Sequence, residues 1–234
     1  LADALHQART GGRCRLVLAI RDEEAEVLRR LAPGIRVETL PLGIDMTRYR
    51  PREPASPPIV ALIGSWERAP NVDGAREFLA RGWPRLRARV PGVRLRLVGK
   101  RVSPEFGEAA RRAGADVVGY VEDMTLEFAR ASALVVPLWM GSGVRVKIIE
   151  ALAARVPVAS TTLGAEGLGL RHGVHLALAE TAETLGDAVA GLVEQPEHAQ
   201  SLADAGNRHV HAAFDLSSVA RRTLDLCASV AGGS

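Results

Sequence analysis

Between residues 59 and 179, short apolar runs alternate with amphipathic stretches of helical period. The apolar runs predict strands at Ile59–Ile63, Leu95–Val98, Val117–Val118, Ala133–Leu138, from Pro157 onward, and at His175–Ala179. The other stretches predict helices at Ser103–Ala113, Asp123–Ala131, Thr181–Leu192, Pro196–Ala213 and Leu216–Val230. Two more helices are predicted with one bound each: one begins at about Asn71 and has a break or kink near Trp83-Pro84, and one ends at about Ala154. Strands that alternate with helices in this way predict an α/β fold with a doubly wound, six-stranded parallel sheet.

The first 57 residues follow a different pattern. Two extended apolar runs, Arg15–Ile20 and Ile35–Leu40, flank a helix predicted at Asp22–Leu31, whose first turn is acidic. A proline-rich stretch without periodicity, residues 41–58, then reads as a linker or a crossing between domains. Since one strand–helix–strand unit cannot bury a core alone, we expect residues 1–57 to be the remnant and linker of a domain whose first part is absent, and residues 58–234 to be a second domain.

Composition narrows the class of protein. The 30 basic and 27 acidic residues leave a net charge of +3, and no basic run is interleaved with aromatic residues, so a nucleic-acid partner is not expected. Cys14 and Cys227 have neither metal-ligand spacing nor a disulfide framework, which suits a reducing cytoplasm. There is no apolar run near the ~20 residues that a membrane span needs, and no signal-peptide pattern.

Residues 133–160 form the strand–turn–helix–strand unit around which the chain is organised. A glycine-bearing turn, Gly141-Ser142-Gly143, precedes the helix, and loop amides at a helix N-terminus favour an anion. At helical spacing, Lys147 and Glu150 share one stripe with Gly143 and Ala154, so a cation and then a carboxylate follow the loop. That order suits a phosphate followed by a sugar with two hydroxyls. An alternative on spacing alone is an ordinary solvated Lys–Glu pair.

Other motifs that would define the chemistry are missing. Val146 occupies the position where a dinucleotide-binding fingerprint has its third glycine. The phosphate-binding loop of nucleoside triphosphatases does not occur either. The six histidines form no metal-binding pair and are interpreted as structural or surface residues, and no Asp-x-Asp pair occurs, so neither a metal nor a cofactor is expected. Because ligands of doubly wound sheets bind at the carboxyl ends of strands, Gly64, Ser65 and Gly99 join the candidate site.

The motifs in order resemble a known family. Five segments carry the resemblance: PLGID at 41–45, GS at 64–65, LVGK at 97–100, VVGYVED at 117–123 and VVPLWMGSGVRVKIIEALAARVPVASTTLGAEGL at 135–168. In this order they are similar to the carboxyl-terminal domain of family 4 retaining glycosyltransferases of the GT-B architecture. That family is also described as glycosyl transferases group 1. The resemblance covers about residues 16–216. It implies a Rossmann-like second domain that binds a nucleoside-diphosphate sugar, preceded by a remnant of the acceptor domain.

The resemblance also implies roles for residues. Glu150 matches the second glutamate of the family's E-x7-E motif, which holds the ribose hydroxyls, and Lys147 matches the cation that meets the diphosphate. Gly141, Ser142 and Gly143 would offer amides to phosphate and sugar. Tyr120, Val121 and Asp123 fall where the family's loop borders the base. The first glutamate of the motif is Ser142 here, and the family's early Arg and Lys-Gly are Ser65 and Pro70-Asn71, which leaves Arg68, Arg145 and Lys147 as candidate partners of the diphosphate.

The function expected from these observations is sugar transfer, with retention, from a nucleoside-diphosphate sugar to an acceptor. The chain would be mainly the donor-binding half of a cytoplasmic enzyme and inactive alone. Peripheral membrane association of the full-length protein stays open. Catalytic residues, the base and the acceptor are not identified by the sequence. Two alternatives stay open: a nucleotide-sugar epimerase of the same architecture, and a binding module that has lost transfer.

Overall fold

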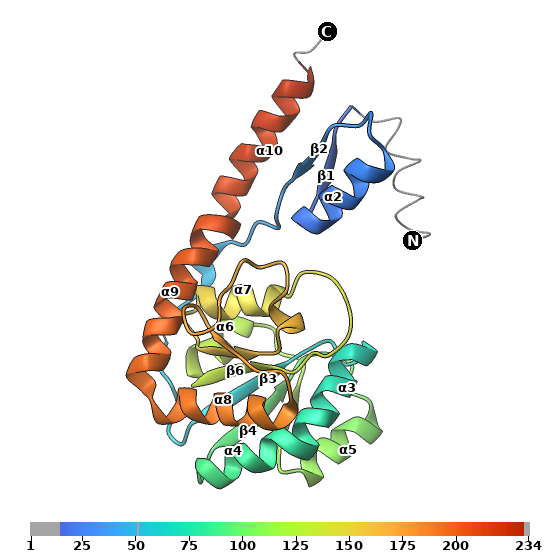
Figure 1. The fold of residues 1–234 in the computed structure, drawn as a ribbon. Helices are drawn as coiled ribbons and strands as arrows, with labels where there is room; N and C mark the ends of the chain where they lie inside the picture. Colours follow the sequence, from blue (N-terminus) through green and yellow to red (C-terminus); the bar gives the residue numbers. More distant parts are fainter. Residues whose placement is uncertain (1–14, 51, 232–234) are drawn as a thin grey trace. The chain divides into compact units, whose positions relative to one another are not determined.

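The computed structural model describes residues 15–50 and 52–231 (Figure 1). The described residues fall into two compact units. One comprises the chain up to Met46 together with residues from Ala212 onward, and the other comprises Thr47–His211. The sequence predicts a domain boundary at 57/58. The compact units divide between Met46 and Thr47, and the residues from Ala212 onward belong with the first unit.

The first unit contains a small parallel sheet. Strands β1 (Val17–Ala19) and β2 (Val37–Thr39) pair in parallel, and helix α2 (Asp22–Leu31) connects them. Ala25 and Leu28 of α2 are buried against the sheet, and α2 carries acidic residues in its first turn and basic residues in its last, as its dipole favours. Helix α10 (Leu216–Ala231) belongs to the same unit. The strand–helix–strand pattern predicted from the sequence is therefore confirmed.

The second unit is built on a six-stranded, wholly parallel sheet in the order β5-β4-β3-β6-β7-β8. Its strands are β3 (Ile59–Ile63), β4 (Arg94–Val98), β5 (Asp116–Gly119), β6 (Ala133–Val136), β7 (Val158–Ser160) and β8 (Ala177–Leu178). The predicted doubly wound parallel sheet is confirmed. The strand order reverses between β3 and β6, so the two strands at the centre of the sheet leave a crevice at their carboxyl ends.

Helices cover both faces of this sheet (Figure 1). They are α3 (Ala69–Glu77), α4 (Trp83–Arg89), α5 (Pro104–Arg112), α6 (Met124–Arg130), α7 (Val146–Ala153), α8 (Ala182–Glu194) and α9 (Pro196–Phe214), with short 3-10 turns η1 (Met46–Arg48) and η3 (Leu163–Ala165). The core on one face joins β3, β4, β6 and β7 to α3, α4, α5 and α8. Helices α6 and α7 contact β3, β6 and β7 and lie on the opposite side in Figure 1.

The break predicted near Trp83-Pro84 is a widened turn. A π-helical segment, η2 (Phe78–Gly82), joins α3 to α4, so the helical course continues through the proline. Pro84 cannot donate a hydrogen bond within this continuous helix, and the π-helical turn directly before it accommodates the missing donor. A methyl group at Gly82 would lie 2.4 Å from the carbonyl oxygen of Ala182, so this turn packs directly against the start of α8.

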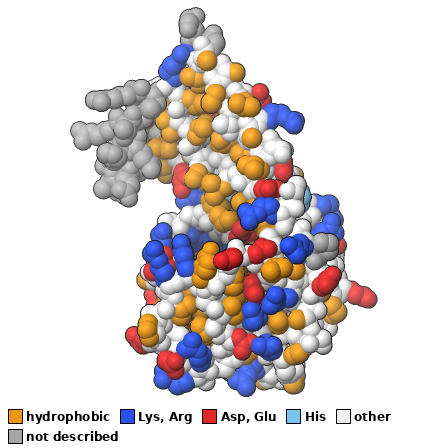
Figure 2. Space-filling view, turned by 180° about the vertical axis from the view of Figure 1, so that it is seen from behind, with side chains coloured by type: hydrophobic (Ala, Val, Ile, Leu, Met, Phe, Trp, Pro, Cys, Tyr) orange, Lys and Arg blue, Asp and Glu red, His pale blue; other side chains and the backbone are white. Residues whose placement is uncertain are grey.

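Side chains of both charge signs are interspersed on the face of the sheet-containing unit that Figure 2 shows. Exposed ion pairs of this unit include Arg85 with Asp187 at 2.7 Å and Arg94 with Asp116 at 2.6 Å. Among the described residues, no helix is both long and apolar enough to cross a bilayer.

Candidate functional site

A pocket of about 530 Å³ lies where the carboxyl ends of the central strands meet two helix N-termini. Pro70 and Asn71 stand in the first turn of α3, and Val146 and Lys147 in the first turn of α7. The lining is completed by Ser65, Arg68, Leu138, Gly141, Ser142, Val144 and Arg145. The pocket brings together six of the residues predicted from the sequence: Ser65, Arg68, Gly141, Ser142, Arg145 and Lys147. Two positive helix ends facing one pocket favour a negatively charged ligand.

The glycine loop is held by Arg145. Its Nη1 donates to the carbonyls of Ser142 (2.6 Å) and Gly143 (2.9 Å), and its Nη2 donates to that of Gly141 (3.0 Å). Gly141 and Gly143 have φ angles of 100° and 99°, where glycine avoids the cost that a side chain would bring. Arg145, predicted as a partner of the diphosphate, therefore uses three hydrogen bonds to shape the loop. The amides of residues 141–143 make no hydrogen bond to any described residue.

Lys147 connects the two sides of the pocket. Its Nζ donates to the carbonyl of Ile63 at 2.6 Å and to Oδ1 of Asn71 at 3.3 Å. The residue is half-buried, and burial of the ammonium, together with the neighbouring charge of Arg145, lowers the pKa of Lys147 from 10.5 to about 8. An ammonium in this state is stabilised by an anion, which would replace the solvation lost on burial.

Asn71 is a site residue that sequence reasoning did not identify. Its Nδ2 donates to the carbonyl of Ser65 at 3.0 Å, while its Oδ1 accepts from Lys147. The amide thus ties the loop after β3 to the first turn of α7. The sequence marked this position only as a departure from the family's Lys-Gly.

Glu150 lies one turn beyond Lys147 on α7 and is half-buried. Burial raises the pKa of its carboxyl, while a hydrogen bond from Tyr49 and the charge of Arg48 lower it. The Tyr49 hydroxyl donates to Glu150 Oε1 at 3.2 Å. The Lys–Glu order on α7 is present as predicted, but the stripe is shorter, because Gly143 precedes the helix and Ala154 is its buried C-cap.

Gly64 and Gly99 do not line the pocket but permit close packing at the strand ends. A methyl group at Gly99, whose φ is 133°, would lie 1.8 Å from the carbonyl oxygen of Gly64. Only glycine fits there.

The predicted base-bordering segment lies at the start of α6. Asp123 is the N-cap of that helix and accepts from the backbone amide (2.9 Å) and hydroxyl (2.6 Å) of Thr125. These two bonds lower the pKa of Asp123. Tyr120 is 70% exposed, and Val121 is partly exposed. None of the three lines the pocket between α3 and α7.

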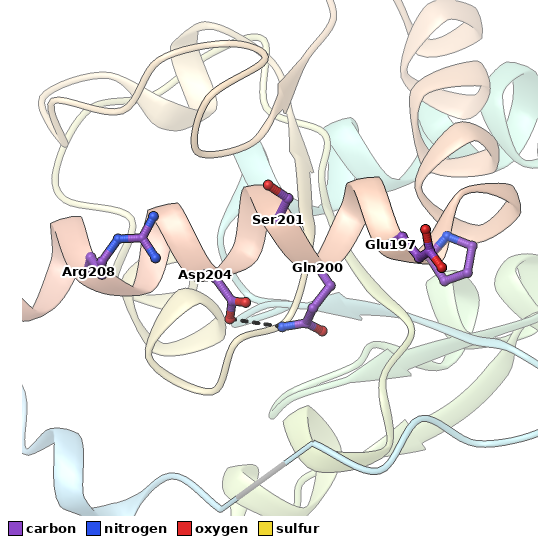
Figure 3. A pocket seen from close by; sticks show the side chains of 6 residues that line it. Glu197, Gln200, Ser201, Asp204 and Arg208 are labelled. Carbon is purple, nitrogen blue, oxygen red and sulfur yellow. Dashed lines mark hydrogen bonds between the residues drawn. The ribbon is translucent and has the colours of Figure 1, made fainter.

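A second hollow, of about 570 Å³, follows one face of α9 (Figure 3). Its lining comes from a single helix, and the side chains bond to one another and to a residue just beyond α7. Gln200 Nε2 donates to Asp204 Oδ1 at 3.0 Å, and Arg155, which follows the C-cap of α7, pairs with the same oxygen at 3.2 Å. Such a surface lacks the groups converging from several elements that a ligand site needs. In the described part of the chain, no cluster of His, Cys, Asp and Glu side chains could hold a metal ion.

The fold and the pocket together define a doubly wound α/β protein with an anion-suited pocket at the switch point of its sheet. Residues 57–195 match the family model described as Glycosyl transferases group 1, and the chain therefore belongs to this family. By sequence, it matches no curated protein.

Solved structures share the fold at low identity. Sucrose-phosphate synthase from Thermosynechococcus elongatus is 20% identical with a TM-score of 0.81, over 100% of this chain and 62% of that one. HepE from Anabaena, in complex with UDP and glucose, is 17% identical with a TM-score of 0.76, over 97% and 67%. A glycosyltransferase from Rickettsia africae is 14% identical with a TM-score of 0.80, over 98% and 68%. The α/β fold is thus that of GT-B proteins, and the chain spans only about two thirds of these relatives.

Proposed function

We propose that this chain is the donor-binding half of a retaining, family 4 glycosyltransferase, which transfers a sugar from a nucleoside-diphosphate sugar to an acceptor. Membership of glycosyl transferases group 1 supports the reaction class. The complexes of HepE with UDP and with UDP-glucose support a nucleotide-sugar ligand. In this proposal, the acceptor side is supplied by a domain of which residues 1–57 are a remnant, and the enzyme acts in the cytoplasm.

The observation that carries the proposal is the charge arrangement of the pocket. The first turns of α3 and α7 border a pocket that Arg68, Lys147, Gly141 and Ser142 also line. The backbone amides of residues 141–143 make no hydrogen bond to any described residue. Within the described residues, the Arg68 guanidinium makes no hydrogen bond or ion pair, whereas Arg145 is committed to the loop carbonyls. We therefore assign the diphosphate to Arg68, Lys147 and the loop amides, with the ribose hydroxyls bound one turn further along α7 by Glu150.

Neutralisation by cations and helix amides needs no metal ion. Nucleotide binding should therefore persist in the presence of a chelator. The base would be bordered by residues 120–123.

A nucleotide panel tests the proposal. Thermal shift followed by calorimetry on this chain with UDP, GDP and ADP should identify one base that binds, and Arg68→Gln should weaken that binding roughly tenfold, as expected for a lost charge-assisted bond of about 1.5 kcal/mol. Arg85→Gln is the matched control, because Arg85 is also an exposed arginine but pairs with Asp187 far from the pocket. Absence of binding to all three nucleotides would reject the proposal.

Transfer itself requires the acceptor to be held against the donor with water excluded. We therefore expect the isolated chain to bind nucleotide but not to transfer sugar at a useful rate. Robust transfer by this chain alone, measured as acceptor-linked radiolabelled sugar, would contradict the assignment as a half.

A further inference from the structure

We infer that Tyr49 is a positioning residue for nucleotide recognition: its hydroxyl orients the Glu150 carboxylate so that one oxygen faces the cis-diol of the ligand's ribose. The inference rests on the proposed function and adds to it a residue from the linker, which lies 101 positions before Glu150 in the sequence. No motif of the glycine loop or of α7 contains this residue.

The geometry fixes only one of the two carboxylate oxygens. The Tyr49 hydroxyl donates to Oε1 of Glu150 at 3.2 Å. A carboxylate has about four lone-pair sites on its two oxygens, so a single donor leaves Oε2 able to accept from a ligand. Of the described side chains, none donates a hydrogen bond to Oε2. Glu150 therefore keeps accepting capacity while its orientation is set.

The Tyr49 ring is fixed independently of its hydroxyl. It stands edge-on to Phe128 of α6, with ring centroids 6.2 Å apart and an interplanar angle of 63°. Phe128 is fully buried, so this contact anchors the phenol to the core of the unit. A phenylalanine at position 49 would keep this contact and lose only the hydroxyl. The effect of the hydroxyl on Glu150 can therefore be separated from packing.

The Tyr49 hydroxyl also affects the pKa of the Glu150 carboxyl. Burial of Glu150 raises the pKa of its carboxyl, and the bond from Tyr49 opposes that effect, with Arg48 adding a smaller one. A carboxylate accepts from both ribose hydroxyls, whereas a protonated carboxyl accepts less well and must donate. The Tyr49 hydroxyl thus both orients Glu150 and favours its charged form.

The experiment is a cycle that changes one hydroxyl on the protein and the diol on the ligand. The nucleoside diphosphate that binds best in the UDP, GDP and ADP panel is compared with its 2′,3′-dideoxy counterpart by calorimetry, on the full 234-residue chain and on Tyr49→Phe. The unsubstituted chain should prefer the ribonucleotide by tenfold or more, and Tyr49→Phe should reduce this preference three- to tenfold while binding the dideoxynucleotide unchanged. Thr184→Val is the control, since it removes a hydroxyl that bonds within the start of α8, away from the pocket.

The ratio of the two affinities also provides a pH readout, because ionisation of the phosphates cancels between the ligands. As the pH falls, the preference for the ribonucleotide should be lost at a higher pH in Tyr49→Phe than in the unsubstituted chain. A purely structural role would change both affinities equally and leave the ratio and its pH profile unmoved.

The outcomes distinguish the role of Tyr49 from the proposed nucleotide-binding function. An unchanged preference in a folded Tyr49→Phe overturns the role of Tyr49 but leaves the proposed function intact. A Tyr49→Phe chain that is unfolded at 25 °C, beside a folded Thr184→Val, assigns the hydroxyl to stability and overturns it as well. An unsubstituted chain that binds none of the nucleotides, or binds ribo and dideoxy forms equally, rejects the proposed site itself.

Discussion

Raising the pH through about 8 should weaken nucleotide binding by this chain, because Lys147 loses its charge there. The diphosphate and the Lys147 ammonium attract one another, so bound nucleotide raises the pKa of Lys147 and binding takes up a proton above pH 8. Affinity should therefore be nearly constant between pH 7 and 7.5 and then fall by up to about tenfold per pH unit. The terminal phosphate, with a pKa of about 6, is already ionised throughout this range.

The same residue predicts how stability depends on pH. The pKa of Lys147 is lower in the folded protein, about 8, than its ordinary value of 10.5, so between these values the unfolded chain binds more protons and folding stability rises with pH. At about 1.4 kcal/mol for each pH unit, the difference between 10.5 and about 8 corresponds to at most roughly 3.5 kcal/mol. Since the chain contains only two lysines, few other groups titrate in this range.

Calorimetric titration with nucleotide and urea unfolding, each at several pH values from 7 to 10, measure the two effects. Lys147→Met keeps a side chain of similar length without the charge. It should bind nucleotide weakly, with no fall in affinity above pH 8, and should lose the rise in stability. A flat affinity for the unsubstituted chain between pH 7.5 and 9.5, or an equal fall in Lys147→Met, would refute the reasoning.

Three further substitutions, one control substitution and the removal of metal ions test other parts of the structure. Glu150→Gln should lower nucleotide affinity roughly tenfold or more, measured by calorimetry. Unchanged affinity would show that Glu150 is an ordinary solvated residue of the helix surface. Glu127→Gln breaks the bidentate pair with the mostly buried Arg96, at 3.0 Å for both bonds, and should cost about 3 kcal/mol in urea unfolding, whereas Glu108→Gln at an exposed pair should cost at most ~0.5 kcal/mol. Equal losses would contradict that distinction. Gly99→Ala should unfold the chain or lower its melting temperature strongly, because the added methyl meets a carbonyl at 1.8 Å; a normal melting curve would show that the strand ends can separate. Chelator should leave nucleotide binding unchanged, and a loss of binding would show that a metal takes part.

Much of the fold could be predicted from the sequence because buried parallel strands are continuous apolar runs. The boundaries of β3 (Ile59–Ile63) and α2 (Asp22–Leu31) agree with the prediction to the residue. Strand ends were less certain: β8 is limited to Ala177–Leu178, within the predicted His175–Ala179. Pro84 predicted a disturbance in the helix, but whether a chain breaks or widens into a π turn depends on what packs against it, and here α8 does.

The candidate site was predicted in part. The glycine loop, Lys147 and Glu150 occur on adjacent turns of one segment, so spacing alone could place them together. Asn71 and Tyr49 could not be found in this way, because they lie 76 and 101 residues from the side chains that they bond. Asp123 was assigned to the ligand side, yet its carboxylate caps α6; an acidic residue before a helix fits both roles equally well in sequence.

The sequence by itself determined which segments are strands and helices, that the sheet is parallel, and that a glycine loop precedes a helix carrying Lys147 and Glu150. These are local properties of periodicity and of residue type. The tertiary structure decided what each charged group does. Arg145 donates to the loop carbonyls and Lys147 to the carbonyl of Ile63, whereas the Arg68 guanidinium makes no hydrogen bond or ion pair within the described residues. The physical reason is that a backbone carbonyl is the same acceptor in every residue, so only its position in the folded chain can select the side chain that it binds.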